Sequence, residues 1–297
     1  MEILFLGTGS MVPTATRNHS GILLSHTNEH LLIDCGEGTQ RQLRIAGFPP
    51  PKITKILLTH WHGDHYFGLP GLIENLAKNN YHGTLELFGP KGTKARLAQL
   101  LTIFTLERRI PIKVHEITKD GIFYTGKDYS LLAHALNHSI PCIAYTFLEH
   151  DKRKINIDYV KKIGIPQGPI LGTLQEGKPI TFKGKKITPH QVTFLQKGKK
   201  IVFILDTNIC ANIAKAAKEA DILVADSTFS SALTEKAEEY KHLTAAQAAT
   251  IAKKAKAKKL ILTHFSQRYK NVDELLAEAT AIFPHTIAAD DFMKISV

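Results

Sequence analysis

Short apolar runs separated by polar turns dominate the first part of the chain. Three of them, EILFL, GILLS and HLLID, occupy residues 2–6, 21–25 and 30–34 and predict short strands. A fourth run, KITKILLT at residues 52–59, predicts a buried strand. The segment at residues 37–47 is helical in pattern and ends with a glycine, which is typical of a helix C-terminus.

Strand and helix patterns alternate along the rest of the chain. Several further strands are expected up to about Phe147. The helical patterns lie at residues 69–80, 93–107, 212–220 and 243–257, and the strand patterns at residues 84–88, 200–205, 221–225 and 259–263. This alternation predicts an α/β fold in which helices cover the sheets.

Residues 150–187 depart from this alternation because they are rich in glycine, proline and lysine. Such a composition predicts an inserted flexible arm, either protruding or forming a long functional loop. A disordered linker is the alternative, but the isoleucines in this segment disfavour it, since a solvated linker has little use for them.

Charge adds a class of partner to this picture. The chain carries a formal net charge of +11, and residues 151–186 alone hold nine Lys and Arg against three Asp and Glu, a net +6. Basic segments favour a polyanionic partner such as nucleic acid. A lysine-rich surface that only keeps the protein soluble is the alternative.

Composition also bears on the compartment. No apolar run reaches the length of a membrane span, and the N-terminal sequence lacks the pattern of a signal peptide. The three cysteines, Cys35, Cys142 and Cys210, are scattered and form no thiolate metal motif. These features predict a cytoplasmic protein without a membrane partner.

The densest chemistry lies directly after the buried strand at residues 52–59. The segment THWHGDHYFG places His60, His62, Asp64 and His65 within six positions. In an open α/β sheet, ligand sites form at the carboxyl ends of strands. His60 and His62 are two residues apart and can bind one ion, while Asp64 and His65 point elsewhere and can bind a second. The crowding therefore predicts two adjacent metal sites.

Four ligands are too few for two sites, so further ligands are expected at other strand ends. Four residues follow apolar runs in the required way: His138, Asp206, Asp226 and His264. An Asp offers two oxygens, which makes Asp206 the natural bridge between two ions. Imidazole and carboxylate ligands together favour Zn²⁺, with Mn²⁺ or another divalent ion as the alternative.

At this point the chain resembles the ribonuclease Z family of the metallo-β-lactamase superfamily, whose members cut the 3′ trailer from precursor tRNA. The HxHxDH core is shared by the whole superfamily, whereas HGDHYFGLPGL and the GPxxGxLxxG pattern are specific to the family. The similar segments cover nearly the whole chain in family order: FLGTGS, LLIDCGEGTQRQL, LLTHWHGDHYFGLPGLI, NHSIPCIAY, IPQGPILGTLQEG and LILTHFSQRY.

The resemblance implies a single domain over residues 1–297 with a four-layer αβ/βα sandwich. It implies one zinc on His60, His62, His138 and Asp206, and a second zinc on Asp64, His65, Asp206 and His264. Asp64 would also act on the attacking water as general base, and His242 would be the proton donor. The family uses the arm as an exosite for the tRNA, in a homodimer in which one subunit's arm serves the other subunit's site.

Five residues are expected to contact the substrate. Arg17 and Asn18 match the last two positions of a PxKxRN loop, although Ala15 stands where the family has lysine. Gly168 and Pro169 belong to the arm motif, and Arg268 follows a predicted ligand and suits phosphate. The family's SGDT and HEAT segments read ILDT and ADST here, so Asp226 replaces the glutamate that would support His242.

The predicted reaction leaves a 3′ hydroxyl on the tRNA and a 5′ phosphate on the trailer. Two other functions stay open. Another hydrolase of the superfamily, such as a thioesterase or lactonase, would use the same metal ligands, but a small substrate needs no basic arm. A catalytically silent RNA-binding scaffold is disfavoured by the complete ligand set.

Overall fold

The computed structural model describes residues 1–79, 81–105 and 110–297. Within these residues, the main body is built on two seven-stranded sheets. The order of the first is β18 (Lys294–Ser296), β1 (Glu2–Gly7), β2 (Gly21–His26), β3 (Glu29–Ile33), β4 (Lys55–Leu57), β5 (Leu85–Pro90) and β6 (Ile112–Ile117). The order of the second is β17 (Thr286–Ala288), β16 (Leu260–Thr263), β15 (Ile222–Asp226), β14 (Lys200–Ile204), β9 (Cys142–Glu149), β8 (Tyr129–Leu136) and β7 (Gly121–Thr125).

Helices cover the outer face of each sheet. The first sheet packs against helices α1 (Thr39–Ile45), α3 (Leu69–Lys78) and α4 (Thr93–Thr102). The second packs against α8 (Ala211–Ala217), α10 (Ala245–Lys254) and α11 (Asp273–Ile282), and α9 (Thr234–Tyr240) lies at its edge. The four layers confirm the predicted αβ/βα sandwich.

Apolar residues on consecutive positions explain why the strands pack between two layers. In β1, Ile3 and Phe5 face the second sheet, while Leu4 and Leu6 face the helices. Successive strand residues point to opposite faces, so a strand that is buried on both faces reads as an uninterrupted apolar run. In β14, Phe203 joins the cluster between the sheets and Val202 joins the cluster under the helices.

Each sheet changes from antiparallel to parallel pairing part way across. In the first sheet β1, β2 and β3 pair antiparallel, and β3, β4, β5 and β6 pair parallel. The second repeats this order, because β7, β8, β9 and β14 pair antiparallel and β14, β15, β16 and β17 pair parallel. The carboxyl ends of the parallel strands therefore lie along one edge of each sheet.

Most predicted strands and helices are present with small shifts in their ends. The strand predicted at residues 52–59 is shorter, because Pro50–Lys52 form a 3₁₀ turn and β4 begins at Lys55. The helix predicted at residues 93–107 ends at Thr102. Residues 106 and 107 of that prediction, and residue 80 of the helix predicted at 69–80, lie outside the described part of the chain. The histidine-rich loop contains a short helix, α2 (Gly63–Tyr66), that was not predicted.

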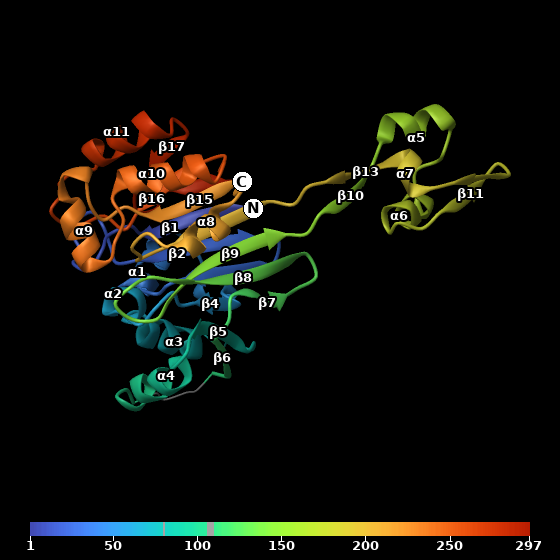
Figure 1. The fold of residues 1–297 in the computed structure, drawn as a ribbon. Coiled ribbons are helices and arrows are strands. Elements are labelled where there is room, and N and C mark those ends of the chain that lie inside the picture. Colours follow the sequence, from blue (N-terminus) through green and yellow to red (C-terminus); the bar gives the residue numbers. More distant parts are fainter. Residues whose placement is uncertain (80, 106–109) are drawn as a thin grey trace.

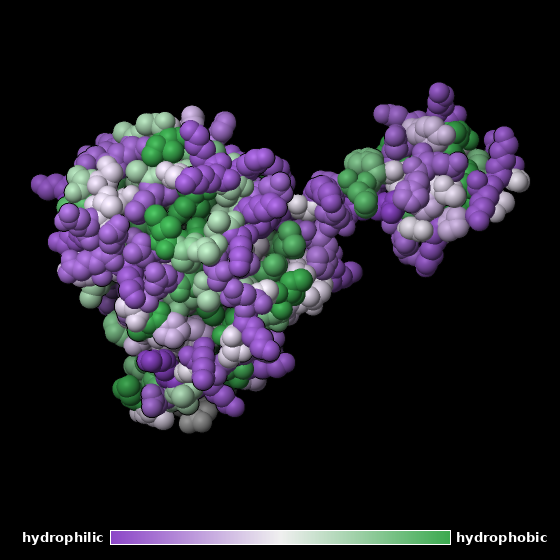
Figure 2. Space-filling view, viewed as in Figure 1, coloured by the Kyte–Doolittle hydropathy of each residue, from purple (hydrophilic) through white to green (hydrophobic). Residues whose placement is uncertain are grey.

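The arm predicted as flexible at residues 150–187 is a folded lobe that extends further along the chain. Strands β10 (Lys152–Ile155) and β13 (Thr193–Gln196) form its stalk. The lobe itself contains α5 (Ile157–Ile163), α6 (Pro169–Gln175), β11 (Ile180–Phe182), β12 (Lys185–Ile187) and α7 (Pro189–Val192). Val160, Ile165, Leu174 and Val192 form a small buried cluster, which is why a Gly- and Lys-rich segment folds. Figures 1 and 2 show the lobe standing away from the main body.

None of the helices in the described ranges combines the length and the apolar character that a membrane span requires.

Two glycines let the histidine-rich segment lie directly against the end of β3. The amide of Gly68 donates to the carbonyl of Cys35 (2.9 Å), and the amide of Cys35 donates to the carbonyl of His65 (2.8 Å). A Cβ at Gly68 would collide with the carbonyl oxygen of Gly36, and a Cβ at Gly36 would collide with the carbonyl oxygen of Asp64. Backbone therefore packs against backbone at this point.

We expect Gly68→Ala to destabilise the protein by about 1–3 kcal/mol, because the added Cβ would collide with the backbone carbonyls of Gly36 and Cys35, and no side-chain rotation can relieve that contact. Gly71→Ala is the matched control in α3, since the added methyl group would meet the movable end of the Gln40 side chain. That substitution should be neutral or stabilise by up to about 1 kcal/mol. Urea unfolding of both variants checks this, and equal midpoints would contradict the packing argument.

Candidate metal centre

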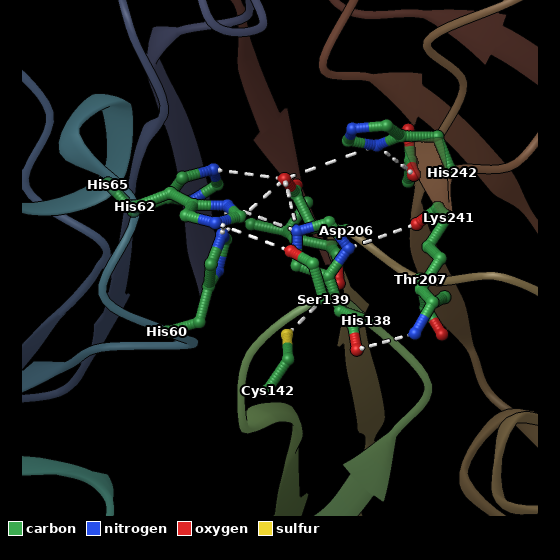
Figure 3. A network of polar contacts seen from close by, with 12 residues as sticks. His60, His62, His65, His138, Ser139, Cys142, Asp206, Thr207, Lys241 and His242 are labelled. Atoms are coloured by element: carbon green, nitrogen blue, oxygen red, sulfur yellow. Dashed lines mark hydrogen bonds and ion pairs between the residues drawn. The ribbon is translucent and has the colours of Figure 1, made fainter. Parts of the chain in front are cut away.

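Side chains from both sheets converge at the edge where the parallel strands end. The segment after β4 supplies His60, His62, Asp64 and His65. The second sheet supplies His138 from the turn between β8 and β9, and Asp206 and His264 from the ends of β14 and β16. Figure 3 shows the histidines from both sheets pointing toward Asp206. The structure thus brings together all seven residues that were predicted as metal ligands.

The first set consists of His60, His62, His138 and Asp206, whose nearest ligand atoms all lie within 4.8 Å of one another. His62 Nδ1 lies 3.0 Å from His60 Nε2 and 3.1 Å from His138 Nε2. Asp206 Oδ2 lies 3.5 Å from His60 Nε2 and 3.8 Å from His138 Nε2. Three imidazole nitrogens and one carboxylate oxygen around a common point are a ligand set that zinc accepts.

The second set consists of Asp64, His65, Asp206 and His264, and all four residues are buried. His65 Nε2 lies 3.3 Å from Asp64 Oδ2 and 3.4 Å from Asp206 Oδ2. His264 Nε2 lies 3.4 Å from Asp64 Oδ2 and 3.2 Å from Asp206 Oδ1. Asp206 therefore contributes both of its oxygens and belongs to both sets.

Backbone conformation aims these side chains. Asp34, Asp206 and His264 end β3, β14 and β16 and have positive φ angles of 58°, 39° and 63°. Residues other than glycine seldom adopt this region, and such conformations concentrate at functional sites. Each turns the chain sharply at a strand end, so the side chain enters the space between the sheets.

The buried polar atoms fit a metal ion better than they fit one another. Within the two ligand sets, His65 Nε2 and Asp206 Oδ1 are buried and neither donate nor accept a hydrogen bond. Orphaned buried polar atoms are costly in a native protein unless something else satisfies them. Both belong to the second set, so a cation there would satisfy two atoms that have charged neighbours at 3.2–3.4 Å but no hydrogen bond.

The two sets differ in the protons that they hold without metal. Burial lowers the pKa of His264, but the nearby carboxylates of Asp206, Asp226 and Asp64 outweigh burial and raise the pKa to about 10. Burial also disfavours a charged His65, yet Asp64 and Asp206 raise its pKa well above the usual value. In the first set, burial lowers the pKa of all three histidines, and the charge on His65 lowers that of His60 further.

Two residues that support the ligands were missed in the sequence. Asp34 is fully buried and its Oδ2 lies 2.7 Å from His65 Nδ1, while Thr59 Oγ1 lies 3.0 Å from His60 Nδ1. Asp34 also accepts from the amide and hydroxyl of Thr59. Partners of this kind fix the orientation of a ligand ring. Asp34 directly follows the strand HLLI, so the strand-end signal that found Asp206 also identifies it.

His242, the predicted proton donor, lies beside the second set. Its Nδ1 lies 3.0 Å from Asp226 Oδ2 and 4.0 Å from Asp206 Oδ2. Burial disfavours its charged form, but Asp226 and Asp206 raise its pKa above the usual value. Asp226 also accepts from the backbone amide of Leu243 (3.1 Å) and from the hydroxyl of Thr228 (2.6 Å). The shorter aspartate thus reaches His242, as expected of the residue that replaces the family's glutamate.

A pocket of about 750 Å³ opens over the two sets and is lined by Asp64, His138, Asp206, His242 and Arg268, among others. Arg268 was predicted to contact substrate, and its Nε donates to Ser266 Oγ (2.9 Å) at the pocket wall. Gly168 and Pro169 lie at the start of α6 in the lobe and do not line this pocket.

Arg17 and Asn18 were also predicted to contact substrate, but the structure gives them internal partners. Arg17 donates to Thr8 Oγ1 (2.6 Å), the carbonyl of Ala289 (2.8 Å) and Asp290 Oδ1 (2.7 Å). Asn18 Nδ2 donates to the carbonyl of Glu37 (2.8 Å). Neither side chain lines the pocket, so both residues hold the loop in place, and its tip reaches the pocket through Met11 and Val12.

Comparisons with known proteins agree with this architecture. The family model of anti-Pycsar protein Apyc1 matches residues 1–108. Ribonuclease Z of Methanothermobacter thermautotrophicus is 38% identical over 300 residues, covering 100% of this chain and 97% of that protein. Ribonuclease Z of Bacillus licheniformis is 39% identical, covering 99% and 98%.

Solved structures share the fold over the whole chain. Human tRNase Z, short form, has a TM-score of 0.73 and 29% identity, covering 100% of this chain and 99% of its own. The metallo-β-lactamase fold protein YhfI from Bacillus subtilis has a TM-score of 0.72 and 19% identity, covering 99% and 98%. The fold and the histidine-rich centre define a metallo-β-lactamase fold hydrolase. Full-length identity above 30% settles the branch: the chain belongs to the ribonuclease Z family.

We expect metal-free protein to take up about two divalent ions per chain at pH 7 and to release about two protons, because metal displaces protons from ligands. The protons come from His65 and His264, since the histidines of the first set are already neutral. Affinity at the second set should therefore fall as the pH falls, while the first set is less sensitive.

Calorimetric zinc titrations in buffers of different ionisation enthalpy measure the protons directly. His264→Ala should lower both the number of bound ions and the number of released protons. Uptake of two ions without proton release would contradict the assignment of charge to His65 and His264.

Proposed function

We propose that this protein is a zinc-dependent endoribonuclease that removes the 3′ trailer from precursor tRNA, leaving a 3′ hydroxyl on the tRNA and a 5′ phosphate on the trailer. The observation that carries the proposal is the pair of ligand sets that share Asp206, at the base of an open pocket. Membership of the ribonuclease Z family supports the choice of RNA as substrate.

The first set would hold one zinc ion and the second set another. Two such ions supply Lewis-acid activation of water and neutralisation of phosphate charge. Asp206 would lie between them, since its two oxygens face different histidines. The donor set of imidazoles and carboxylates also accepts Mn²⁺.

Asp64 has the position and the charge of a general base. In the metal-free protein, burial would raise its pKa, but protonated His65 and His264 hold the pKa well below the usual value, so the side chain is a carboxylate at neutral pH. It lines the pocket with one oxygen fixed between the two histidines. A carboxylate so placed can orient the attacking water and accept its proton.

His242 can supply a proton to the leaving 3′ oxygen. Asp226 binds Nδ1, so the opposite ring nitrogen, Nε2, presents the proton, and the side chain lines the pocket. Asp226 and Asp206 raise its pKa, which favours the protonated imidazole that a proton donor requires. Arg268, on the same wall, is placed to bind a phosphate oxygen.

The lobe would be the exosite for the body of the tRNA. Residues 152–196 hold nine Lys and Arg against two Asp and Glu, a net charge of +7, and most of these lysines are exposed. Figure 2 shows a largely hydrophilic lobe surface. A hydrolase of small molecules in the same superfamily has no use for such an appendage, which favours a polyanionic substrate.

The position of the lobe supports a long substrate and a homodimer. His138 precedes β9 and Asp206 follows β14, whereas the stalk continues from the other ends of these strands. Eight residues of β9 span roughly 26 Å at about 3.3 Å per residue. A lobe so far from its own pocket can serve the distal part of a bound tRNA, or the pocket of a second subunit. We propose that the protein acts as a cytoplasmic homodimer.

Asp64→Ala should nearly abolish cleavage of 3′-extended tRNA, because the variant loses the base that acts on the water and one ligand of the second set. Binding of the tRNA should be almost unchanged, since the lobe and the first set remain. Single-turnover cleavage and filter binding separate the two effects. Retention of a tenth of wild-type turnover at saturating zinc would refute the role of Asp64.

Deleting the lobe should impair binding and spare the chemistry. Residues 152–196 can be replaced by a short Gly/Ser bridge, because Lys152 and Gln196 face each other across the stalk. We expect the tRNA KM to rise by orders of magnitude and its salt dependence to flatten, since each lost phosphate contact removes about 0.9 from the log–log slope. Hydrolysis of bis(p-nitrophenyl) phosphate should barely change.

A milder control replaces Lys183, Lys185 and Lys186 in the β11–β12 hairpin by glutamine, which keeps the lobe folded and removes three charges. This variant should raise the tRNA KM and flatten its salt dependence less than the deletion does. A deletion variant that binds zinc and cuts precursor tRNA at the wild-type KM would eliminate the exosite proposal.

A further inference from the structure

Two large aromatic side chains are half exposed at the rim of the metal pocket. Phe67 is 54% exposed and Tyr240 is 50% exposed, and both line the pocket. The two residues come from different halves of the sandwich. Phe67 follows α2, on the side of the first sheet, and Tyr240 ends α9, on the side of the second sheet. Exposed aromatic surface inside a pocket indicates a contact with a ligand.

Phe67 is fixed in place by the histidine-rich segment itself. A Cβ at Gly63 would collide with the Phe67 ring, so the ring lies directly on the backbone of that residue. The ring also contacts Tyr66, with centroids 4.8 Å apart. Because Gly63 immediately precedes Asp64, the exposed face of Phe67 has a defined position next to the proposed general base.

Tyr240 is supported by a column of aromatic and cationic groups. Its ring lies 6.5 Å from that of Phe229 at an interplanar angle of 27°, and Lys236 Nζ lies 6.0 Å from its centroid. Phe229 is buried, and the Arg268 guanidinium lies over its ring, 4.8 Å from the ring centroid. Tyr240 precedes His242 by two residues, so this column lies on the side of the proposed proton donor.

We propose that Phe67 and Tyr240 are stacking platforms for the two nucleobases that flank the scissile phosphodiester. The inference rests on the proposed function and assigns positioning roles in that reaction. Stacking on an aromatic ring tolerates any base, because every base has a π-face. Such platforms would hold the backbone across the metal centre while leaving the identity of the two nucleotides unread.

The chemistry decides which base meets which ring. His242 protonates the leaving 3′ oxygen, so the nucleoside that keeps this oxygen, on the tRNA side of the cut, lies toward Tyr240. The attacking water approaches from the opposite side, where Asp64 lies. Phe67 adjoins Asp64 and receives the first nucleoside of the trailer.

The test combines side-chain truncation with removal of the base. Three 3′-extended tRNAs are compared: one with all bases, one abasic at the nucleotide before the cut, and one abasic at the first trailer nucleotide. The enzymes are the wild type, Tyr240→Ala and Phe67→Ala, with Tyr240→Phe and Phe67→Tyr as rescue variants. Ile122→Ala, which removes an exposed side chain of β7 outside the pocket, is the control.

Tyr240→Ala should raise the KM for the complete substrate about 5- to 150-fold, the range for loss of one stacked base. The base before the cut should then contribute nothing more, so the abasic tRNA is cut equally by Tyr240→Ala and the wild type. Phe67→Ala should show the same relation to the first trailer base. The rescue variants and Ile122→Ala should resemble the wild type, with metal content and thermal midpoint unchanged throughout.

Additive effects of truncation and base removal would overturn the platforms while leaving the proposed function intact, since the wild type still cuts the complete tRNA. Loss of zinc in Phe67→Ala, restored by Phe67→Tyr without dependence on any base, would show a merely structural ring and would also overturn its role. A wild type that does not cut the complete tRNA refutes the proposed function and the platforms together.

Discussion

A single buried carboxylate determines where the rest of the site must be. Asp206 lies within 4 Å of histidines from both sheets: its Oδ2 is near His60, His65 and His138, and its Oδ1 is near His264. A charge in this position is tolerated only because cations surround it, whether these are imidazolium groups or metal ions. The histidines lower its pKa well below the usual value against the effect of burial. The centre can therefore assemble only when the two sheets pack against each other.

The repeated order of pairing in the two sheets brings the candidate ligands together. Each sheet turns from antiparallel to parallel pairing, so each supplies several strand ends at one edge. Strand-end residues with positive φ then turn their side chains inward. Apolar strands that are buried on both faces hold the edges in register. Close backbone packing at Gly36 and Gly68 leaves no space for a side chain at either position.

The fold and the clustering of the candidate ligands could be predicted from the sequence because both follow local patterns. Uninterrupted apolar runs such as residues 200–205 identify doubly buried strands, and a His or Asp after such a run identifies a ligand. Asp34 obeys the same rule and was overlooked, because it was taken as the last residue of the strand HLLID at residues 30–34 and not as the residue that follows it. The substrate contact of Arg17 stays a prediction, and a sequence match does not reveal that Thr8, Ala289 and Asp290 bind its guanidinium. The secondary structure of the lobe was not predicted, because its cluster of four buried residues is too sparse to create periodicity.

The stalk also has a consequence for how such a protein can change over time. The chain leaves the main body after β9 and returns to it before β14, and these strands are neighbours, with Leu148 facing Lys200. Entry and exit therefore share one short ladder, which continues outward through Lys152 and Gln196. Any segment that begins and ends as a hairpin can be exchanged at this position without altering the register of the core or the approach of Asp206. The lobe is thus a replaceable module, so the substrate-binding segment of the enzyme can change during evolution while its catalytic centre does not.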